Sequence, residues 1–217
     1  GRSTSSNPIV MRCHVELRSS LRTSLCIAIL LLFGCSLRAQ QPDDNYASVV
    51  RHPGWSYGLL VVGGSSVTAG PTAGNLGAAF HAGRVLTGER GSGWRRGTLE
   101  WDVNLIPVEY FWVNGTSYGG GFEPVIGRWN FTHGRRRFVP FSEVALGMIL
   151  SPRNLPPGDT SRVNFTAAWD TGARWFVRPK QSLDVAVRVH HLSNAQLGET
   201  NPAINVSLQL MLGYTWQ

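Results

Sequence analysis

His191 and Ser193 are the residues of this 217-residue sequence whose types and spacing most directly suggest chemistry. A serine hydroxyl becomes a nucleophile when a base takes its proton, and neutral imidazole, with an unperturbed pKa of about 6.5, can do this near pH 7. Two residues apart on a strand, the side chains project from one face about 7 Å apart and can lean together. The pair is a candidate nucleophile and base for attack on an ester.

An ester hydrolase also needs hydrogen-bond donors for the oxyanion and a third group that orients the imidazole. Asn194, Asn201 and the backbone amides of residues 195–198 are candidate donors. A His-x-Ser pair alone more often belongs to a surface or a turn. The structural surroundings of the pair must therefore decide whether it is catalytic. The other histidines show no metal-ligand spacing, and we expect neither a metal site nor a cofactor.

The pair ends a strand predicted over residues 181–193, where apolar and other side chains alternate with period two. One row holds Leu183, Val185, Val187 and Val189, and the other holds Asp184, Ala186, Arg188 and His190. His191 and Ser193 continue the apolar row. Two polar groups at the end of such a row are unexpected in a dry core. They are expected where the row faces lipid and the strand ends at the membrane interface.

The remainder of the chain predicts an all-β fold. Turn signals separate eight candidate strands, and no segment shows a helical period. The predicted strands cover residues 54–64, 75–88, 96–108, 120–131, 137–150, 161–177, 181–193 and 203–216. We therefore expect an eight-stranded antiparallel β-barrel.

The sign of the alternation separates two kinds of barrel, and the sequence alone does not fix it. A soluble lipocalin-like barrel points its apolar row inward, whereas a transmembrane barrel points it toward lipid. Aromatic residues at strand ends, strands of about 9–14 residues, and polar rows with charges of both signs favour the transmembrane barrel. With the N-terminus in the periplasm, His191 and Ser193 would lie on the lipid face at the outer leaflet.

The N-terminal region predicts export. From Met11 onward, a basic segment precedes an apolar run at residues 25–33 that is too short to span a membrane, and cleavage is expected near Ala39 or Gln40. We divide the chain into an N-terminal extension and signal peptide, 1–39, and a barrel domain, 40–217. All three cysteines precede residue 40, so the mature chain would have none. A lipoprotein signal with lipid on Cys35 is the alternative.

The charge of the chain points away from nucleic acid. The formal net charge is +7, yet only 15% of residues are charged and residues 135–137 form the one arginine run. A nucleic-acid-binding protein would concentrate more basic residues on one element. We interpret the run as a basic loop, which would also suit an anionic lipid surface.

Several motifs resemble the bacterial outer-membrane lipid A 3-O-deacylase (acyloxyacyl hydrolase-like) family. They are HLSNAQLG at 191–198, NPAIN at 201–205 and GYTW at 213–216, with weaker matches at 121–124, 128–131, 140–143 and 163–165. The resemblance implies an outer-membrane esterase that removes the 3-O-linked hydroxyacyl chain of lipid A without a metal. It implies Ser193 as nucleophile, His191 as base, and Asn194 and Asn201 at the oxyanion or substrate site.

The chain departs from this family at the group that orients the histidine. The family has a glutamate where this sequence has Asn205, and Glu199 in the preceding loop is the alternative orienting group. An asparagine can accept the imidazole N–H but cannot stabilise imidazolium by charge. Two other functions therefore stay open: a non-catalytic outer-membrane barrel with a structural or adhesive role, and a soluble lipid-binding barrel. The expected partners are lipid A or lipopolysaccharide and outer-membrane lipid, and a homodimer is compatible with the sequence.

Overall fold

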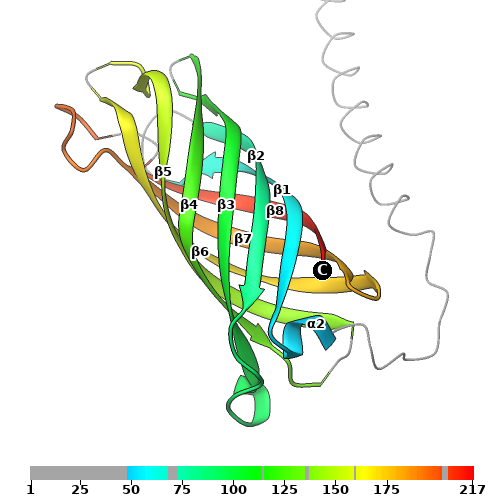
Figure 1. The fold of residues 1–217 in the computed structure, drawn as a ribbon. Coiled ribbons are helices and arrows are strands. Elements are labelled where there is room, and N and C mark those ends of the chain that lie inside the picture. The colour runs from blue at the N-terminus through cyan, green and yellow to red at the C-terminus, as the bar shows by residue number, and fades with distance from the viewer. Residues whose placement is uncertain (1–47, 68–72, 114, 135–136, 159, 202–204) are drawn as a thin grey trace, which may run out of the picture. The chain divides into compact units, whose positions relative to one another are not determined.

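Eight antiparallel strands close into a barrel in the computed structural model, which describes residues 48–67, 73–113, 115–134, 137–158, 160–201 and 205–217 (Figure 1). The strands are β1 (Gly54–Ser66), β2 (Gly74–Val85), β3 (Gly97–Trp112), β4 (Thr116–Phe131), β5 (Phe138–Leu155), β6 (Ser161–Arg178), β7 (Gln181–Ser193) and β8 (Val206–Trp216). A short helix, α2 (Ser48–Arg51), precedes β1, and a 3-10 turn, η1 (Gly93–Arg95), lies between β2 and β3. The predicted signal segment and all three cysteines lie outside the described residues.

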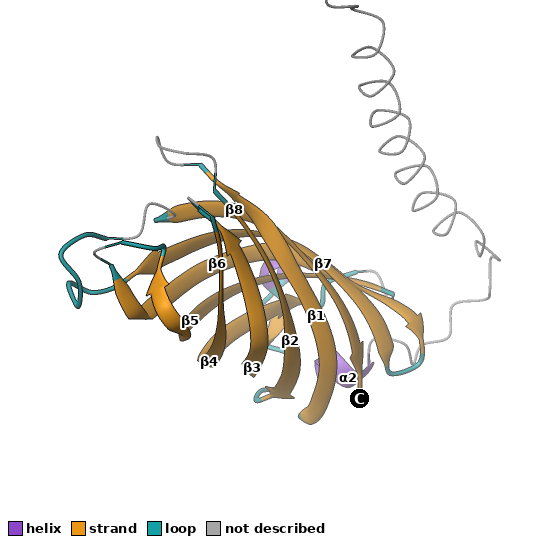
Figure 2. Cartoon of the chain, turned by 90° about the horizontal axis from the view of Figure 1, so that it is seen from above, coloured by secondary structure: helices purple, strands orange, loops and turns teal. Residues whose placement is uncertain are grey.

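Each strand pairs with its neighbour in sequence, and β1 pairs with β8 to close the barrel, as Figure 2 shows from above. The prediction of an eight-stranded antiparallel barrel is confirmed. Several predicted strand ends were wrong. The β3–β4 hairpin is longer than predicted because its ladder runs to Trp112 and Thr116, on either side of a tight turn containing Gly115, which has a φ of 119°. Strand β5 likewise continues to Leu155, whereas β2 already ends at Val85.

Apolar side chains cover the outside of the barrel and most polar side chains point into it. On β7, Val185 and Val187 are 46% and 51% exposed, whereas Asp184 and Arg188 are 2% and 3% exposed. The last strand shows the same order, since Leu208, Leu210 and Leu212 face outward. This sign is the reverse of a soluble barrel and agrees with the transmembrane pattern.

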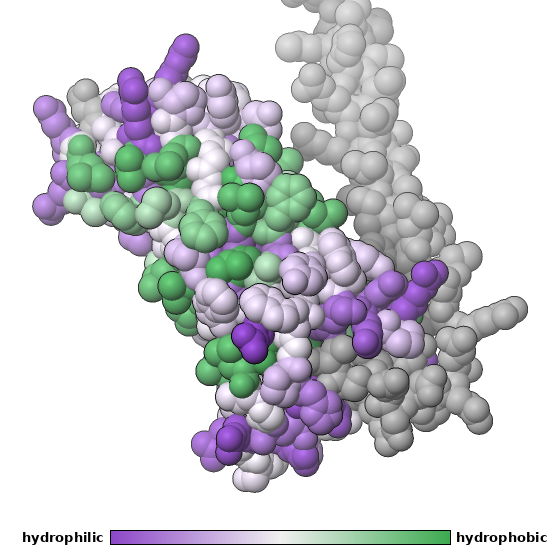
Figure 3. Space-filling view, in the orientation of Figure 1, coloured by the Kyte–Doolittle hydropathy of each residue, from purple (hydrophilic) through white to green (hydrophobic). Residues whose placement is uncertain are grey.

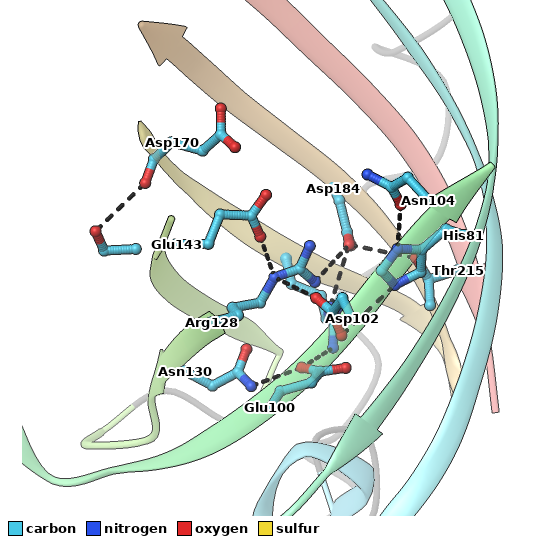
Figure 4. A network of polar contacts seen from close by, with 12 residues as sticks. His81, Glu100, Asp102, Asn104, Arg128, Asn130, Glu143, Asp170, Asp184 and Thr215 are labelled. Carbon is cyan, nitrogen blue, oxygen red and sulfur yellow. Dashed lines mark hydrogen bonds and ion pairs between the residues drawn. The ribbon is translucent and has the colours of Figure 1, made fainter. Parts of the chain in front are cut away.

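Three buried arginines hold the polar interior together, and Figure 4 shows the contacts around one of them, Arg128. Arg128 pairs with Glu143 at 2.5 Å and with Asp102 at 3.2 Å. Arg174 contacts Glu100 and Asp184, and Arg188 binds Asp170 through two nitrogens and Glu123 through the third. These ion pairs offset part of the free-energy cost of removing the charges from water.

Apolar side chains close the interior at both ends. At the end where β7 terminates, a buried cluster comprises Ala73, Phe111, Val113, Ile149, Leu155 and Leu192. At the other end Val50 of α2 packs with Val139 and Phe176, and its carbonyl accepts a hydrogen bond from Thr98. The barrel is therefore filled with side chains, which provides a rigid support for its outer surface.

Exposed aromatic residues gather near the two ends of the wall. Near the start of β1 and the end of β8 these are Trp55, Tyr57, Trp101, Phe138, Trp175, Tyr214 and Trp216, and near the opposite end Tyr110, Trp112, Tyr118 and Phe165. Between these two groups the exposed residues are mostly aliphatic, and three aromatic residues lie among them: Phe80, Phe122 and Trp169. Figure 3 shows the apolar side chains as green areas between purple, hydrophilic ends. Within the described residues, no helix is long and apolar enough to cross a membrane.

Candidate active site on the outer face of β7

His191 and Ser193 lie on the outward-facing side of β7, at the end of the strand and just before the β7–β8 loop. Both are half-buried. The register places His191 between Ala167 of β6 and Val206 of β8, and Ser193 beside Phe165. Ala167 presents only a methyl group beside His191, and the valines of β7 extend away from the pair along the wall. The two candidate residues therefore meet an apolar surface on one side and a polar loop on the other.

The loop that follows holds the Ser193 hydroxyl in a defined position. Its Oγ donates to Oδ1 of Asn201 and accepts from the backbone N–H of Ala195, both at 3.2 Å. The same Asn201 oxygen accepts the N–H of Asn194, also at 3.2 Å. This arrangement fixes the amide orientation of Asn201, because only its oxygen can accept a backbone N–H. The hydroxyl is thus held by one backbone N–H and one side-chain amide oxygen, and a second backbone N–H binds the same oxygen.

Asn194 braces the loop with its buried side chain. Its Nδ2 donates to the carbonyl of Thr200 at 2.7 Å, and its Oδ1 accepts the N–H of Gln196 at 3.0 Å. Ala195 and Gln196 have φ values of 49° and 66°, so the chain reverses sharply directly after the strand. Both polar groups of the Asn194 side chain are therefore occupied by hydrogen bonds within the loop.

The structure places the two candidate orienting residues differently. The carbonyl of Asn205 accepts the N–H of Leu192 at 3.0 Å, so residue 205 lies beside the end of β7, next to the partner of His191. Its Oδ1 is buried and has no hydrogen-bond partner among the described residues. Glu199 is exposed. Within the described parts of the chain, the imidazole of His191 has no hydrogen bond to Ser193, Asn205 or Glu199; catalytic hydrogen bonds are often long before substrate binds.

A cluster of potential metal ligands lies inside the barrel, away from this outer face. His81, Glu100 and Asp102 offer ligand atoms within 4.8 Å of one another. Arg174 already contacts Glu100 at 3.3 Å and Arg128 contacts Asp102 at 3.2 Å, while Nδ1 of His81 lies 2.9 Å from Oδ1 of Asn104. These contacts account for the carboxylates as part of the ion-pair network.

Sequence reasoning identified the residues that the loop gathers around Ser193, but it missed how they are held. The brace from Asn194 to the Thr200 carbonyl has no sequence signal of its own. Nor did the sequence single out Ala167, which lies beside His191 only through the β6–β7 register.

Comparisons with known proteins identify the family of the chain. The family model Lipid A 3-O-deacylase (PagL) matches residues 76–215. Among solved structures, the outer membrane enzyme PagL is 17% identical, covering 75% of this chain and 99% of its own, with a TM-score of 0.49. A de novo designed transmembrane β-barrel (16% identity; 76% and 96% coverage; TM-score 0.37) and Ail of Yersinia pestis (13%; 76% and 99%; 0.25) also match. A comparison with curated proteins finds no match. The family match spans more than half of the chain, including β7, the loop and most of β8, and the chain therefore belongs to the lipid A 3-O-deacylase family.

Proposed function

We propose that this protein is an outer-membrane esterase that removes the 3-O-linked hydroxyacyl chain of lipid A with Ser193 as nucleophile and His191 as base. The observation that carries the proposal is the Ser193 hydroxyl, held by Asn201 and the Ala195 N–H at the end of an apolar outer row. Family membership supports lipid A deacylation in general.

The proposed reaction has two halves. His191 takes the Ser193 proton as Oγ attacks the ester carbonyl carbon, and the C=O electron pair moves onto the oxygen. Collapse of this intermediate expels the sugar 3-oxygen, which receives the proton from His191. Water then attacks the acyl-serine with the same base, releasing a hydroxy fatty acid and restoring the serine.

The loop offers donors for the oxyanion. The Ala195 N–H donates to the hydroxyl, and the Asn194 N–H donates to the Asn201 Oδ1 that the hydroxyl also binds; with this oxygen engaged, Nδ2 of Asn201 is the other available donor. Donors fixed before the reaction stabilise the developing charge without reorganisation.

The apolar outer surface of the barrel supports the proposed location in a membrane. A lipid acyl chain can lie along Val185, Val187 and Val189 only if this row faces a membrane or micelle, and aromatic residues near both ends of the wall fit the two interfaces of a bilayer. We place the candidate site at the outer leaflet of the outer membrane, where lipid A resides, and take residues 1–39 as the export signal.

We expect Asn201→Ala to lower kcat for lipid A deacylation by about 10²-fold, because it removes the acceptor that positions the hydroxyl and a candidate oxyanion donor. Hydroxy fatty acid release from lipid A in detergent micelles measures this. Gln196→Asn in the same loop is the matched control, since asparagine tolerates positive φ, and it should retain activity. Equal losses in both variants would point to loop disruption instead.

Asn205→Glu is expected to raise kcat about tenfold or more. A carboxylate beside the imidazole would stabilise imidazolium, which an amide cannot do. The companion variant is Glu199→Gln, which should leave kcat unchanged if Asn205 is the orienting group. An unchanged rate in Asn205→Glu together with a large loss in Glu199→Gln would transfer the orienting role to Glu199.

A serine-directed fluorophosphonate tests the proposed nucleophile without requiring the natural substrate. Peptide mass spectrometry should place the adduct on Ser193, with labelling at least about tenfold slower in His191→Ala, because the base activates the hydroxyl. Absence of an adduct from the folded barrel, together with unchanged lipid A, would favour the non-catalytic barrel.

A further inference from the structure

The barrel end opposite the candidate site carries an uneven share of positive charge. Antiparallel topology brings α2, the β2–β3 and β4–β5 connections and the β6–β7 turn to this one end, on which Figure 1 also shows the C-terminus. The described residues there include six exposed cations, and we name the five without a carboxylate partner the basic collar: Arg84, Arg90, Arg95, Arg178 and Lys180. At the site end, the exposed cations of the described residues are Arg153 and Arg162.

Few acidic side chains neutralise the positive charge of the basic collar. Glu89 is the exterior acidic side chain described at this end, and it pairs with Arg96 and lies 3.9 Å from Arg51. None of the five collar residues has a carboxylate partner within the described part of the chain. Cations on one rim repel one another when no acidic groups lie between them, so this rim is suited to an anionic ligand.

The collar adjoins the lipid-facing wall. Arg84 projects from the outer face of β2, and its guanidinium lies 5.3 Å from the centroid of the Trp55 ring, with Trp101 on the next strand at the same level. Arg95 lies 5.6 Å from the Trp94 ring, which is 72% exposed. Aromatic rings at the interface with guanidinium groups beside them match the depth of lipid phosphates.

We propose that the basic collar binds the headgroup phosphates of anionic phospholipids in the leaflet opposite the candidate site. The collar residues lie at two places on this rim, on β2 with the β2–β3 connection and at the β6–β7 turn, so lipids on different sides of the barrel could reach them, and arginine favours phosphate. The inference rests on the membrane location proposed above and is independent of the esterase chemistry.

The full chain in nanodiscs of phosphatidylcholine with about 20% phosphatidylglycerol provides the test. After mild detergent extraction, mass spectrometry measures the ratio of the two lipids that remain bound. We expect at least about threefold enrichment of phosphatidylglycerol at low salt, since each basic residue near the surface favours anionic lipid, and loss of most enrichment at about 0.5 M salt.

Two charge variants separate the collar from net charge. Replacing all five collar residues by glutamine should abolish the enrichment, whereas Arg153→Gln with Arg162→Gln should preserve it. Equal enrichment in the collar variant, or an equal loss in both variants, would overturn the proposal. Heat-modifiable migration confirms that each variant is folded. Failure of the wild-type barrel to enter nanodiscs would instead contradict the membrane location, and with it the collar proposal.

Discussion

Ser193→Ala is expected to reduce the rate of lipid A deacylation by about 10⁴-fold or more, the largest functional effect of any single substitution in this barrel. The methyl group cannot form the acyl intermediate, and only binding and oxyanion stabilisation would remain. His191→Ala should cause a similar loss, because nucleophile and base act as a unit. Purified protein with lipid A in detergent micelles, assayed for released hydroxy fatty acid, provides the measurement.

The fold should not change in these variants. Ser193 is half-buried on the outer face, and the hydrogen bonds of its side chain go to Asn201 and Ala195 in the loop. Heat-modifiable migration should therefore remain as in the wild type. Ser117→Ala, at another hairpin of the same rim, is the matched control and should retain full activity. Full activity in Ser193→Ala would assign the chemistry to another residue.

Arg128→Met is expected to cost about 3–5 kcal/mol of unfolding free energy, the largest stability effect we predict. The Arg128 guanidinium contacts Glu143, Asp102 and Asp184, at 2.5, 3.2 and 3.7 Å, and lies over the Phe141 ring. Removing the cation leaves buried carboxylates without their main partner. Urea unfolding of the folded barrel in micelles, followed by tryptophan fluorescence, measures the change.

Arg153→Met is the matched control for this experiment. Arg153 is exposed at the barrel rim, and its replacement should change the unfolding free energy by less than about 0.5 kcal/mol. If Arg128→Met were equally mild, the interior network of Figure 4 would not hold the barrel together.

Much of the fold could be predicted because alternation is a local property of the sequence. The rows of β7 and β8 are separated by period two alone, and the positions of His191 and Ser193 on the outer row follow from it. The sign of that alternation could not be read from the rows themselves, because a soluble and a transmembrane barrel share the same pattern.

Long-range contacts were less accessible. Arg128 lies in the segment 128–131 that resembles the family. Its central place in the ion-pair network depends on Asp184, 56 positions later in the sequence, which reaches the same point of the interior. Asn205 shows the same limitation. Its Oδ1 is buried without a described partner where regular alternation ends, and spacing cannot state how a side chain points once a strand becomes irregular.

Mass spectrometry of lipid A from a bacterial host that produces this chain tests the central claim most directly. The account predicts that one hydroxyacyl chain is lost, that fragmentation assigns the loss to the 3-position, and that hosts producing Ser193→Ala retain the intact molecule. Unchanged lipid A in the presence of the folded wild-type barrel in the outer membrane, or the same loss with Ser193→Ala, would contradict it.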